Sequence, residues 1–310
     1  MKISILAFLF IVVFMGCNSP GEKSETSNTE QKEIVVTHEL GTTNVKTSPE
    51  RVVVLDLGSL ETLDELGVKV VGTAKRNLPQ YLSKFEDDSS VTDVGTLKEV
   101  NFEKIKELNP DLIIISGRLQ NSYEELSEIA PTIFVAVDNN DYLNSFEKNV
   151  RLLGEIFNKE EEAEKALADV NVKIKENQEQ IKTVPGKALI VLFNNGRFSA
   201  YGKNSRFGFI HDVLGVKPAI EDLKVSSHGN AVSNEFIEQT NPDYLFIIDR
   251  GAIVNGKRSS KDEIENALIK QTNAYKNDKI IYLNPQIWYL SGGGLISINK
   301  MTDEIREAVK

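Results

Sequence analysis

The sequence predicts an α/β protein with two similar Rossmann-like lobes joined by a rigid, long helical backbone. The first observation is an internal repeat, because residues 100–118 match residues 232–250 at a constant offset of 132. The second is a stretch without proline, residues 142–184, whose apolar residues recur at helical spacing. A repeated helix-and-strand element implies two similar lobes, and the helical stretch between the copies implies their connection.

The N-terminus has the form of an export signal. Lys2 precedes an apolar run, residues 3–15, which is too short to span a bilayer. Residues 1–16 therefore predict a secretory signal peptide, and Cys17 stands where signal peptidase would cut before a lipid-modified residue. Cys17 is the single cysteine, so no intramolecular disulfide can form. We expect lipidation of Cys17, with an ordinary free thiol as the alternative.

A polar segment separates this signal from the folded part. Residues 18–33 contain no large apolar side chain, so residues 17–33 are predicted to be a lipidated cysteine followed by a flexible tether. We expect the N-terminal lobe at 34–141, the helical linker at 142–184 and the C-terminal lobe at 185–310.

The N-terminal lobe is predicted from short apolar runs and helix-ending signals. A strand is expected at residues 51–56, followed by a helix that ends near residues 66–68. In the first copy of the repeat, Asn101 is a helix N-cap and Pro110 ends that helix. Residues 112–115 then form a buried strand.

The linker is predicted as two successive helices. Phe146, Val150, Leu153 and Phe157 keep the spacing of one helical face. Residues 159–181 are rich in Glu, Ala and Lys, so at 1.5 Å per residue a single helix reaches ~35 Å there. A helical connection of this kind limits hinge closure between the lobes.

The C-terminal lobe is predicted to follow the same plan. Residues 187–193 form a strand, and the next element is a helix that ends near residues 214–216. In the second copy of the repeat, Ser233 is the N-cap, Pro242 ends the helix and residues 244–248 form a buried strand.

Composition and motifs exclude several classes of function. The chain has 36 basic and 46 acidic residues and a net charge of -10, which is too acidic for a general nucleic-acid binder. No P-loop, Gly-x-Ser-x-Gly elbow or His-Glu-x-x-His motif occurs in the sequence. These observations favour a binding protein over an enzyme, although a Ser-His-Asp set is recognised only by geometry.

Three arginines are candidates for ligand binding. Arg118 and Arg250 are related by the repeat and follow predicted strands, at the sheet edge where open α/β sheets bind ligands. Arg206 lies in the glycine-bounded loop 201–208. Guanidinium groups suit oxygen-rich anions, so convergence of the three predicts an anionic ligand. The alternative for each arginine alone is a surface ion pair.

Two loop residues are candidate metal ligands. His228 lies in a polar segment ahead of the second repeated helix, and Tyr289 lies in the glycine-rich segment 288–294. Imidazole and phenolate together are suitable ligands for a hard metal such as ferric iron. The alternatives are a solvent-exposed loop histidine and a packed loop tyrosine.

Several motifs together carry a family resemblance. They are a lipobox, two Asn-Pro-Asp strand units, Gly-Arg-Leu at 117–119, Ser-Arg-Phe-Gly at 205–208, His-Gly at 228–229, Asp-Arg-Gly at 249–251 and Trp-Tyr-Leu-Ser-Gly-Gly-Gly at 288–294. Over residues 34–310 the chain resembles the substrate-binding lipoproteins of ABC importers for ferric siderophores, of the catecholate or petrobactin type.

The resemblance implies a class III periplasmic-binding-protein-like fold with a shallow cleft between the lobes. In that cleft Arg118, Arg206 and Arg250 would hold the anionic ferric catecholate. His228 and Tyr289 would complete the iron coordination when the siderophore supplies only four donor oxygens. The resemblance implies no permanently bound cofactor, and the ferric iron arrives as part of the siderophore complex.

The resemblance also implies partners and a location. Glu103 and Glu235, related by the repeat, match carboxylates that dock onto arginines of the ABC permease dimer, although a first-turn glutamate also stabilises its own helix. Lys75 and Arg76 are expected to add positive charge to the cleft. The protein would lie outside the cell membrane and contact it through the lipid anchor alone.

Two other functions stay open from the sequence. A haem or cobalamin receptor of the same family predicts a wider apolar cleft with an axial ligand in place of an arginine cluster. A surface-anchored hydrolase with His228 as base predicts turnover of an ester or phosphate substrate.

Overall fold

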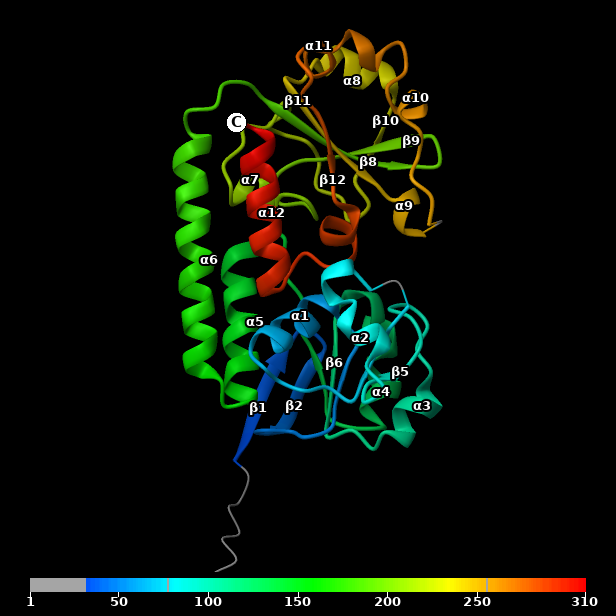
Figure 1. The fold of residues 1–310 in the computed structure, drawn as a ribbon, viewed down its shortest axis with the longest axis vertical. Coiled ribbons are helices and arrows are strands. Elements are labelled where there is room, and N and C mark those ends of the chain that lie inside the picture. The colour runs from blue at the N-terminus through cyan, green and yellow to red at the C-terminus, as the bar shows by residue number, and fades with distance from the viewer. Residues whose placement is uncertain (1–31, 77, 255) are drawn as a thin grey trace, which may run out of the picture. The chain divides into compact units, whose positions relative to one another are not determined.

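The computed structural model describes residues 32–76, 78–254 and 256–310, and these residues contain two five-stranded sheets and one two-stranded hairpin (Figure 1). The predicted signal peptide 1–16, the predicted lipidation site Cys17 and residues 18–31 of the predicted tether lie outside the described residues. Within the described ranges, no helix has the length and apolar character needed to cross a membrane.

The sheet of the N-terminal lobe is parallel throughout. Its order is β5 (Thr92–Asp93), β4 (Gly72–Thr73), β3 (Val52–Val54), β6 (Leu112–Ile115) and β7 (Thr132–Phe134). Successive residues of β3 pack into two different apolar clusters, one on each face, which is why the strand is a continuous run of valine. The other elements here are β1 (Glu33–His38), β2 (Gly41–Lys46), α1 (Leu57–Glu65), α2 (Lys84–Asp87), α3 (Phe102–Glu107) and α4 (Tyr123–Ser127).

The sheet of the C-terminal lobe is mixed. Its order is β10 (Asn230–Val232), β9 (Arg197–Tyr201), β8 (Ala188–Asn194), β11 (Tyr244–Asp249) and β12 (Ile280–Leu283). The last three strands are parallel, whereas β9 and β10 are antiparallel to their neighbours. The helices are α7 (Phe209–Asp212), α8 (Asn234–Thr240), α9 (Gly251–Val254), α10 (Lys261–Ile264) and α11 (Asn273–Lys276).

The sequence analysis expected a helix as the next element after β8, but the structure has strand β9 there. Asn195 and Gly196 connect β8 to β9 with φ values of 49° and 75°. Two consecutive residues with positive φ form the turn that joins a tight hairpin, and Asn-Gly is the favoured pair for it. The expected helix is α7, a single turn that lies beyond this hairpin.

The internal repeat has a physical basis in both lobes. Asn101 caps α3 by accepting from the Lys104 amide at 3.0 Å, and Ser233 caps α8 by accepting from the Phe236 amide at 3.2 Å. At the other end of each helix a residue of the Asn-Pro-Asp unit takes the left-handed conformation, with φ of 45° and 43° for the pair Asn109 and Asn241.

The aspartates of the two Asn-Pro-Asp units fasten the start of another strand. The Asp111 carboxylate accepts from the Arg51 amide just before β3, and the Asp243 carboxylate accepts from the Lys187 amide just before β8. The repeat therefore encodes a helix cap, a helix stop and a strand anchor in each lobe.

Three long helices run beside the two sheets. They are α5 (Tyr142–Ile156), α6 (Glu160–Ile181) and α12 (Leu295–Ala308), and Figure 1 shows α6 running alongside both lobes. Helix α6 packs against α5 and α12, and the Asn177 amide donates to the Thr302 carbonyl at 2.8 Å between α6 and α12. The two helices predicted between the lobes are confirmed as α5 and α6.

Candidate functional site

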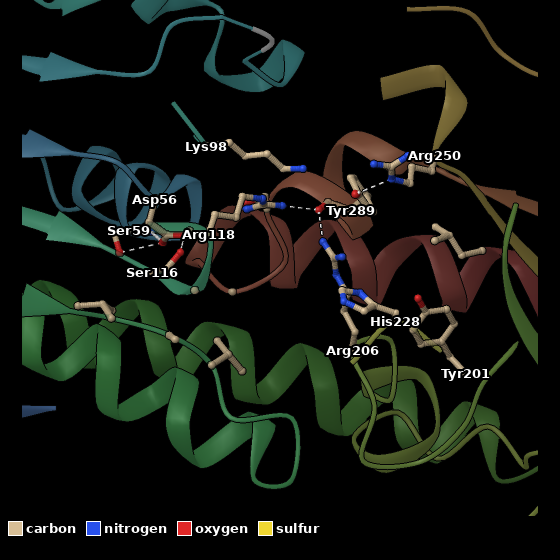
Figure 2. Close-up of a pocket in the computed structure, with 18 of the residues that line it drawn as sticks. Asp56, Ser59, Lys98, Ser116, Arg118, Tyr201, Arg206, His228, Arg250 and Tyr289 are labelled. Carbon is tan, nitrogen blue, oxygen red and sulfur yellow. Dashed lines mark hydrogen bonds between the residues drawn. The ribbon is translucent and has the colours of Figure 1, made fainter. Parts of the chain in front are cut away.

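A cavity of about 820 Å³ lies at the carboxyl ends of the central strands of both sheets. Asp56, Ser116 and Arg118 line it after β3 and β6, and side chains of α5 line it next to them. The C-terminal lobe contributes residues of β8 and β9 and the residue after β11. Figure 2 shows Asp56, Ser59 and Ser116 at one end and Arg250 and Tyr201 at the other.

The three predicted arginines converge on one residue. Arg118 and Arg206 each donate through Nη2 to the backbone carbonyl of Tyr289, at 2.7 and 2.6 Å. The guanidinium of Arg206 also lies 4.3 Å from the centre of the Tyr289 ring. Arg250 donates through Nε to the Tyr289 hydroxyl at 2.8 Å and through Nη1 to Asn194 at 3.0 Å. Figure 2 shows this convergence.

Each arginine is fixed by a local structural feature. Arg118 lies in the 3-10 turn Gly117–Ser122, which follows β6 directly. Arg250 follows β11, and its amide donates to the Phe193 carbonyl of the neighbouring strand at 3.0 Å. Arg206 lies between β9 and α7, where the Ser205 hydroxyl donates to the Gly202 carbonyl at 2.5 Å.

The lining of the cavity is strongly basic. Lys98, Arg118, Arg197, Arg206 and Arg250 line it, and Asp56 is the one carboxylate among its described lining residues. This charge is opposite to the net charge of the chain, -10. A local excess of positive charge in an acidic protein selects an anionic ligand.

The pKa of Arg118 is influenced by charged and polar side chains from both lobes. Burial lowers its pKa and the nearby charge of Arg206 lowers it further, whereas Asp56 and Tyr289 act in the opposite direction. Asp56 itself is occupied, because it accepts from the Ser116 hydroxyl at 2.6 Å and from the Ser59 amide at 2.8 Å as the N-cap of α1.

Tyr289 lies in the π-helical turn Gln286–Leu290, a feature found often at functional sites. Burial by itself raises the pKa of its phenol, but the hydrogen bond from Arg250 and the charges of Arg206, Arg250 and Lys98 outweigh burial. The net effect is a pKa below the ordinary value for tyrosine. The phenolate, which is the form that binds a hard metal, therefore costs less free energy to form here than in an ordinary tyrosine.

His228 lines the same cavity as Tyr289 and is exposed to solvent. It lies in a turn in which the Gly229 amide donates to the Ser226 carbonyl at 3.1 Å. Gly229 has φ of 74° and packs so closely on the Tyr201 ring that a Cβ would overlap it. Only a glycine at position 229 therefore allows the turn that carries His228 to lie this close to Tyr201 at the cavity wall.

The structure does not bring every predicted residue to the cavity. Lys75 and Arg76 are not among its lining residues. The Lys75 ammonium instead donates to the carbonyls of Asp88 at 2.7 Å and Glu86 at 3.3 Å. Glu103 and Glu235 are exposed in the first turns of α3 and α8, one on each lobe.

Sequence reasoning missed Lys98, Arg197 and Tyr201, which all line the cavity. Arg197 and Tyr201 belong to β9. The Asn-Gly pair just before this strand is a hairpin signal that could have revealed it. Lys98 lies in an irregular loop between β5 and α3, and no periodic pattern marks such a position.

Comparison with protein families gives one match, to the model described as periplasmic binding protein, over residues 52–287. That match covers more than half of the chain.

Individual relatives match over nearly the full length. The petrobactin-binding protein YclQ of Bacillus subtilis is 44% identical over 98% of this chain and 97% of its own length. The ferric-anguibactin-binding protein FatB of Vibrio anguillarum is 38% identical over 95% of this chain and 93% of its own.

Solved structures agree with these matches. The crystal structure of YclQ superimposes with a TM-score of 0.88 at 46% identity, covering 90% of this chain and 99% of that one. The siderophore-binding protein BauB, bound to two molecules of acinetobactin and ferric iron, superimposes with a TM-score of 0.82 at 35% identity, with coverage of 90% and 99%.

Proposed function

Since the chain belongs to the periplasmic binding protein family, we propose that it captures a ferric siderophore with catecholate-type donors and delivers it to an ABC importer for iron uptake. The observation that carries the proposal is the convergence of Arg118, Arg206 and Arg250 from both lobes on Tyr289 at the cavity wall. The relatives named for petrobactin and ferric-anguibactin binding support it. The role is that of a binding protein, without turnover of its ligand.

The arginines are suited to hold such a ligand. A ferric catecholate complex carries negative charge on its oxygens, and a guanidinium offers five N–H donors in a planar fork. Within the described structure, Arg118 and Arg206 each use one Nη2 atom and Arg250 uses two nitrogens on protein acceptors. Most donors of the three side chains are left for ligand oxygens.

His228 and Tyr289 are proposed to complete the iron coordination of a tetradentate siderophore. Such a ligand leaves two positions of octahedral ferric iron for protein donors, and a neutral imidazole and a phenolate are suitable for them. The lowered pKa of Tyr289 supports this role for its phenol. A hexadentate siderophore fills all six positions, and the two side chains then only line the cavity.

Titration of the protein without its first 17 residues tests the proposal. Ferric complexes of a tetradentate bis-catecholate and a hexadentate tris-catecholate are added while tryptophan fluorescence and the charge-transfer band are followed. We expect tight binding of at least one complex, and a band shift with the tetradentate complex that is lost in His228→Ala and Tyr289→Phe. Absence of binding by both complexes would reject the proposal, and binding that ignores both substitutions would reject direct coordination.

Docking to the permease is proposed for Glu103 and Glu235, which are exposed on separate lobes. Two repeat-related carboxylates suit a partner with two-fold symmetry. Charge reversal of both residues to arginine is expected to abolish stimulation of importer ATPase activity while siderophore affinity stays unchanged. Retained stimulation in the double variant would reject this docking site.

Attachment to the outer side of the cell membrane is proposed through a lipid on Cys17, after removal of residues 1–16. Expression of Cys17→Ala is expected to release the protein into the medium or leave it unprocessed, whereas the wild type sediments with membranes and incorporates labelled fatty acid. Absence of label in the wild type would reject lipidation.

A further inference from the structure

Glu61 is a fully buried carboxylate that the proposed ligand site does not use. It lies on α1 and has 0% exposure. Within the described residues, no lysine, arginine or histidine lies within ion-pair distance of it. A buried carboxylate without a cation needs several hydrogen bonds to offset the loss of solvation.

Four donors from three segments supply these bonds. Oε2 accepts from the Tyr81 hydroxyl at 2.5 Å and from the Ser291 hydroxyl at 3.0 Å. Oε1 accepts from the Ser297 amide at 2.8 Å and also from the Ser297 hydroxyl. Ser291 and Ser297 stand on either side of the glycines 292–294, so Glu61 holds both ends of that glycine segment.

The glycines make this approach possible. A Cβ on Gly294 would overlap the Glu61 carboxylate and the Gly58 carbonyl, and a Cβ on Gly58 would meet the backbone of Gly293 at 3.0 Å. The Ser297 hydroxyl additionally accepts from the amides of Gly293 and Gly294, both at 3.1 Å. The backbone of Gly293 and Gly294 therefore lies directly on α1.

The stretch from Asn284 to Ser297, called here the Tyr289 segment, is anchored near both ends. Ser291 is two residues after Tyr289, and at the other end Glu304 on α12 accepts from the Trp288 indole at 2.7 Å and from the Asn284 amide at 2.8 Å. Tyr289 thus lies between two anchored points. One anchor is Glu61 on α1, and the other is Glu304 on α12.

We propose that Glu61 is a positioning residue, which fixes the Tyr289 segment on α1 so that the Tyr289 phenol and carbonyl face the three arginines. Its effect on siderophore affinity rests on the proposed function. Its effect on the segment itself does not, because the contacts from Glu61 to Ser291 and Ser297 are made between residues of the protein alone.

Substitution of Glu61 by leucine gives a specific expectation. Leucine has no hydrogen-bond acceptor, whereas glutamine would keep the contacts, because the Tyr81 and Ser291 hydroxyls can also accept from an amide N–H. In Glu61→Leu the bond to Ser291, the member of this network closest to Tyr289 in sequence, is therefore lost. Glu65→Leu is the matched control, because Glu65 is exposed one turn further along the same helix.

Trp288 reports on the segment directly, because it is the single tryptophan of the chain and is 3% exposed. Acrylamide quenching and fluorescence anisotropy of Trp288 are measured in the ligand-free protein, and the affinity for ferric bis-catecholate is then measured. In Glu61→Leu we expect stronger quenching, lower anisotropy, about tenfold weaker binding and loss of the iron–tyrosinate band shift. In Glu65→Leu all four quantities should match the wild type.

If Glu61→Leu fails to fold, Ser291→Ala provides the test instead. This variant removes only the hydroxyl that links Glu61 to Ser291, and the same changes are expected at smaller size. Trp288 signals equal to those of Glu65→Leu in every folded variant would overturn the proposal. If the wild type binds no ferric siderophore, the proposed function fails, while the Trp288 comparison still decides the role of Glu61.

Discussion

Arg250 donates to the Tyr289 hydroxyl. Its substitution by alanine or by lysine distinguishes the loss of the positive charge from the loss of the guanidinium geometry. Arg250→Ala is expected to weaken ferric catecholate binding by about 1 to 3 kcal/mol, because a charge-assisted hydrogen bond is lost. Arg250→Lys should recover only part of this, since an ammonium lacks the planar fork that contacts Tyr289 and Asn194 together. Isothermal titration calorimetry measures both variants.

The matched control for Arg250 is Arg258→Ala. Arg258 is exposed and is not among the residues that line the cavity. Equal affinity of Arg250→Ala and Arg258→Ala would contradict the assignment of Arg250 to the ligand site.

The pKa of Glu61 makes a prediction about stability and pH. Burial raises it from 4.5 to about 7, and the hydrogen bonds from Ser297, Tyr81 and Ser291 offset burial only in part. Between pH 4.5 and about 7 the folded protein binds more protons at Glu61 than the unfolded chain. The stability contributed by Glu61 is therefore fully present below pH 4.5 and is lost as pH rises through about 7.

The expected loss is about 3 kcal/mol, because each unit of pKa difference corresponds to about 1.4 kcal/mol. Urea unfolding at a series of pH values compares the wild type with Glu61→Gln, whose side chain does not titrate. The stability of the wild type should fall relative to Glu61→Gln across this window. A difference between the two that is constant with pH would contradict the raised pKa.

At the scale of residues, the sequence predicted those site positions that follow regular elements. Arg118 and Arg250 come directly after buried strands, and the repeat placed them at equivalent positions in the two lobes. Lys75 also follows a strand, but its ammonium turns to the carbonyls of the α2 region. The direction of a long side chain in a loop depends on tertiary partners, and for this reason Lys98 was missed.

At the scale of elements, the contact between α1 and the glycines 292–294 requires a residue without a side chain at position 294. Gly294→Ala is expected to destabilise the protein by about 1 to 3 kcal/mol, because the new methyl group overlaps the Gly58 carbonyl and the Glu61 side chain. Thermal and urea unfolding measure the change. Gly117→Ala is the matched control, because a Cβ there meets nothing within 4 Å. Equal stability of the two variants would refute the close approach.

The elements themselves were predictable where local signals agree with the fold. Helices α5 and α6 follow from apolar spacing and the absence of proline, and the caps of α3 and α8 follow from Asn101 and Ser233. Strand β9 was missed although Asn195 and Gly196 form a favourable hairpin turn. The sequence analysis expected the C-terminal lobe to follow the strand-then-helix plan of the N-terminal lobe and did not consider this pair.

For the whole molecule, the packing of the long helices predicts how the lobes respond to ligand. Helix α6 has 22 residues, about 33 Å at 1.5 Å per residue, and contacts both α5 and α12. The ion pair of Lys173 with Asp303 at 2.7 Å adds to the contact between α6 and α12. Hinge closure would have to shear these packed helices, so binding is expected without a large change in the separation of the lobes.

Spin labels on the two lobes measure that separation. The chain without its first 17 residues has no cysteine, so Lys106→Cys on α3 and Gln239→Cys on α8 give two unique and exposed attachment sites. Pulsed dipolar spectroscopy is expected to give a single distance distribution that saturating ferric siderophore leaves unchanged. The same protein in concentrated urea provides the control, since its distribution should broaden and move to longer distances. A ligand-induced shortening of several ångströms would contradict a rigid helical connection, because the packing of α5, α6 and α12 would then have to change during binding.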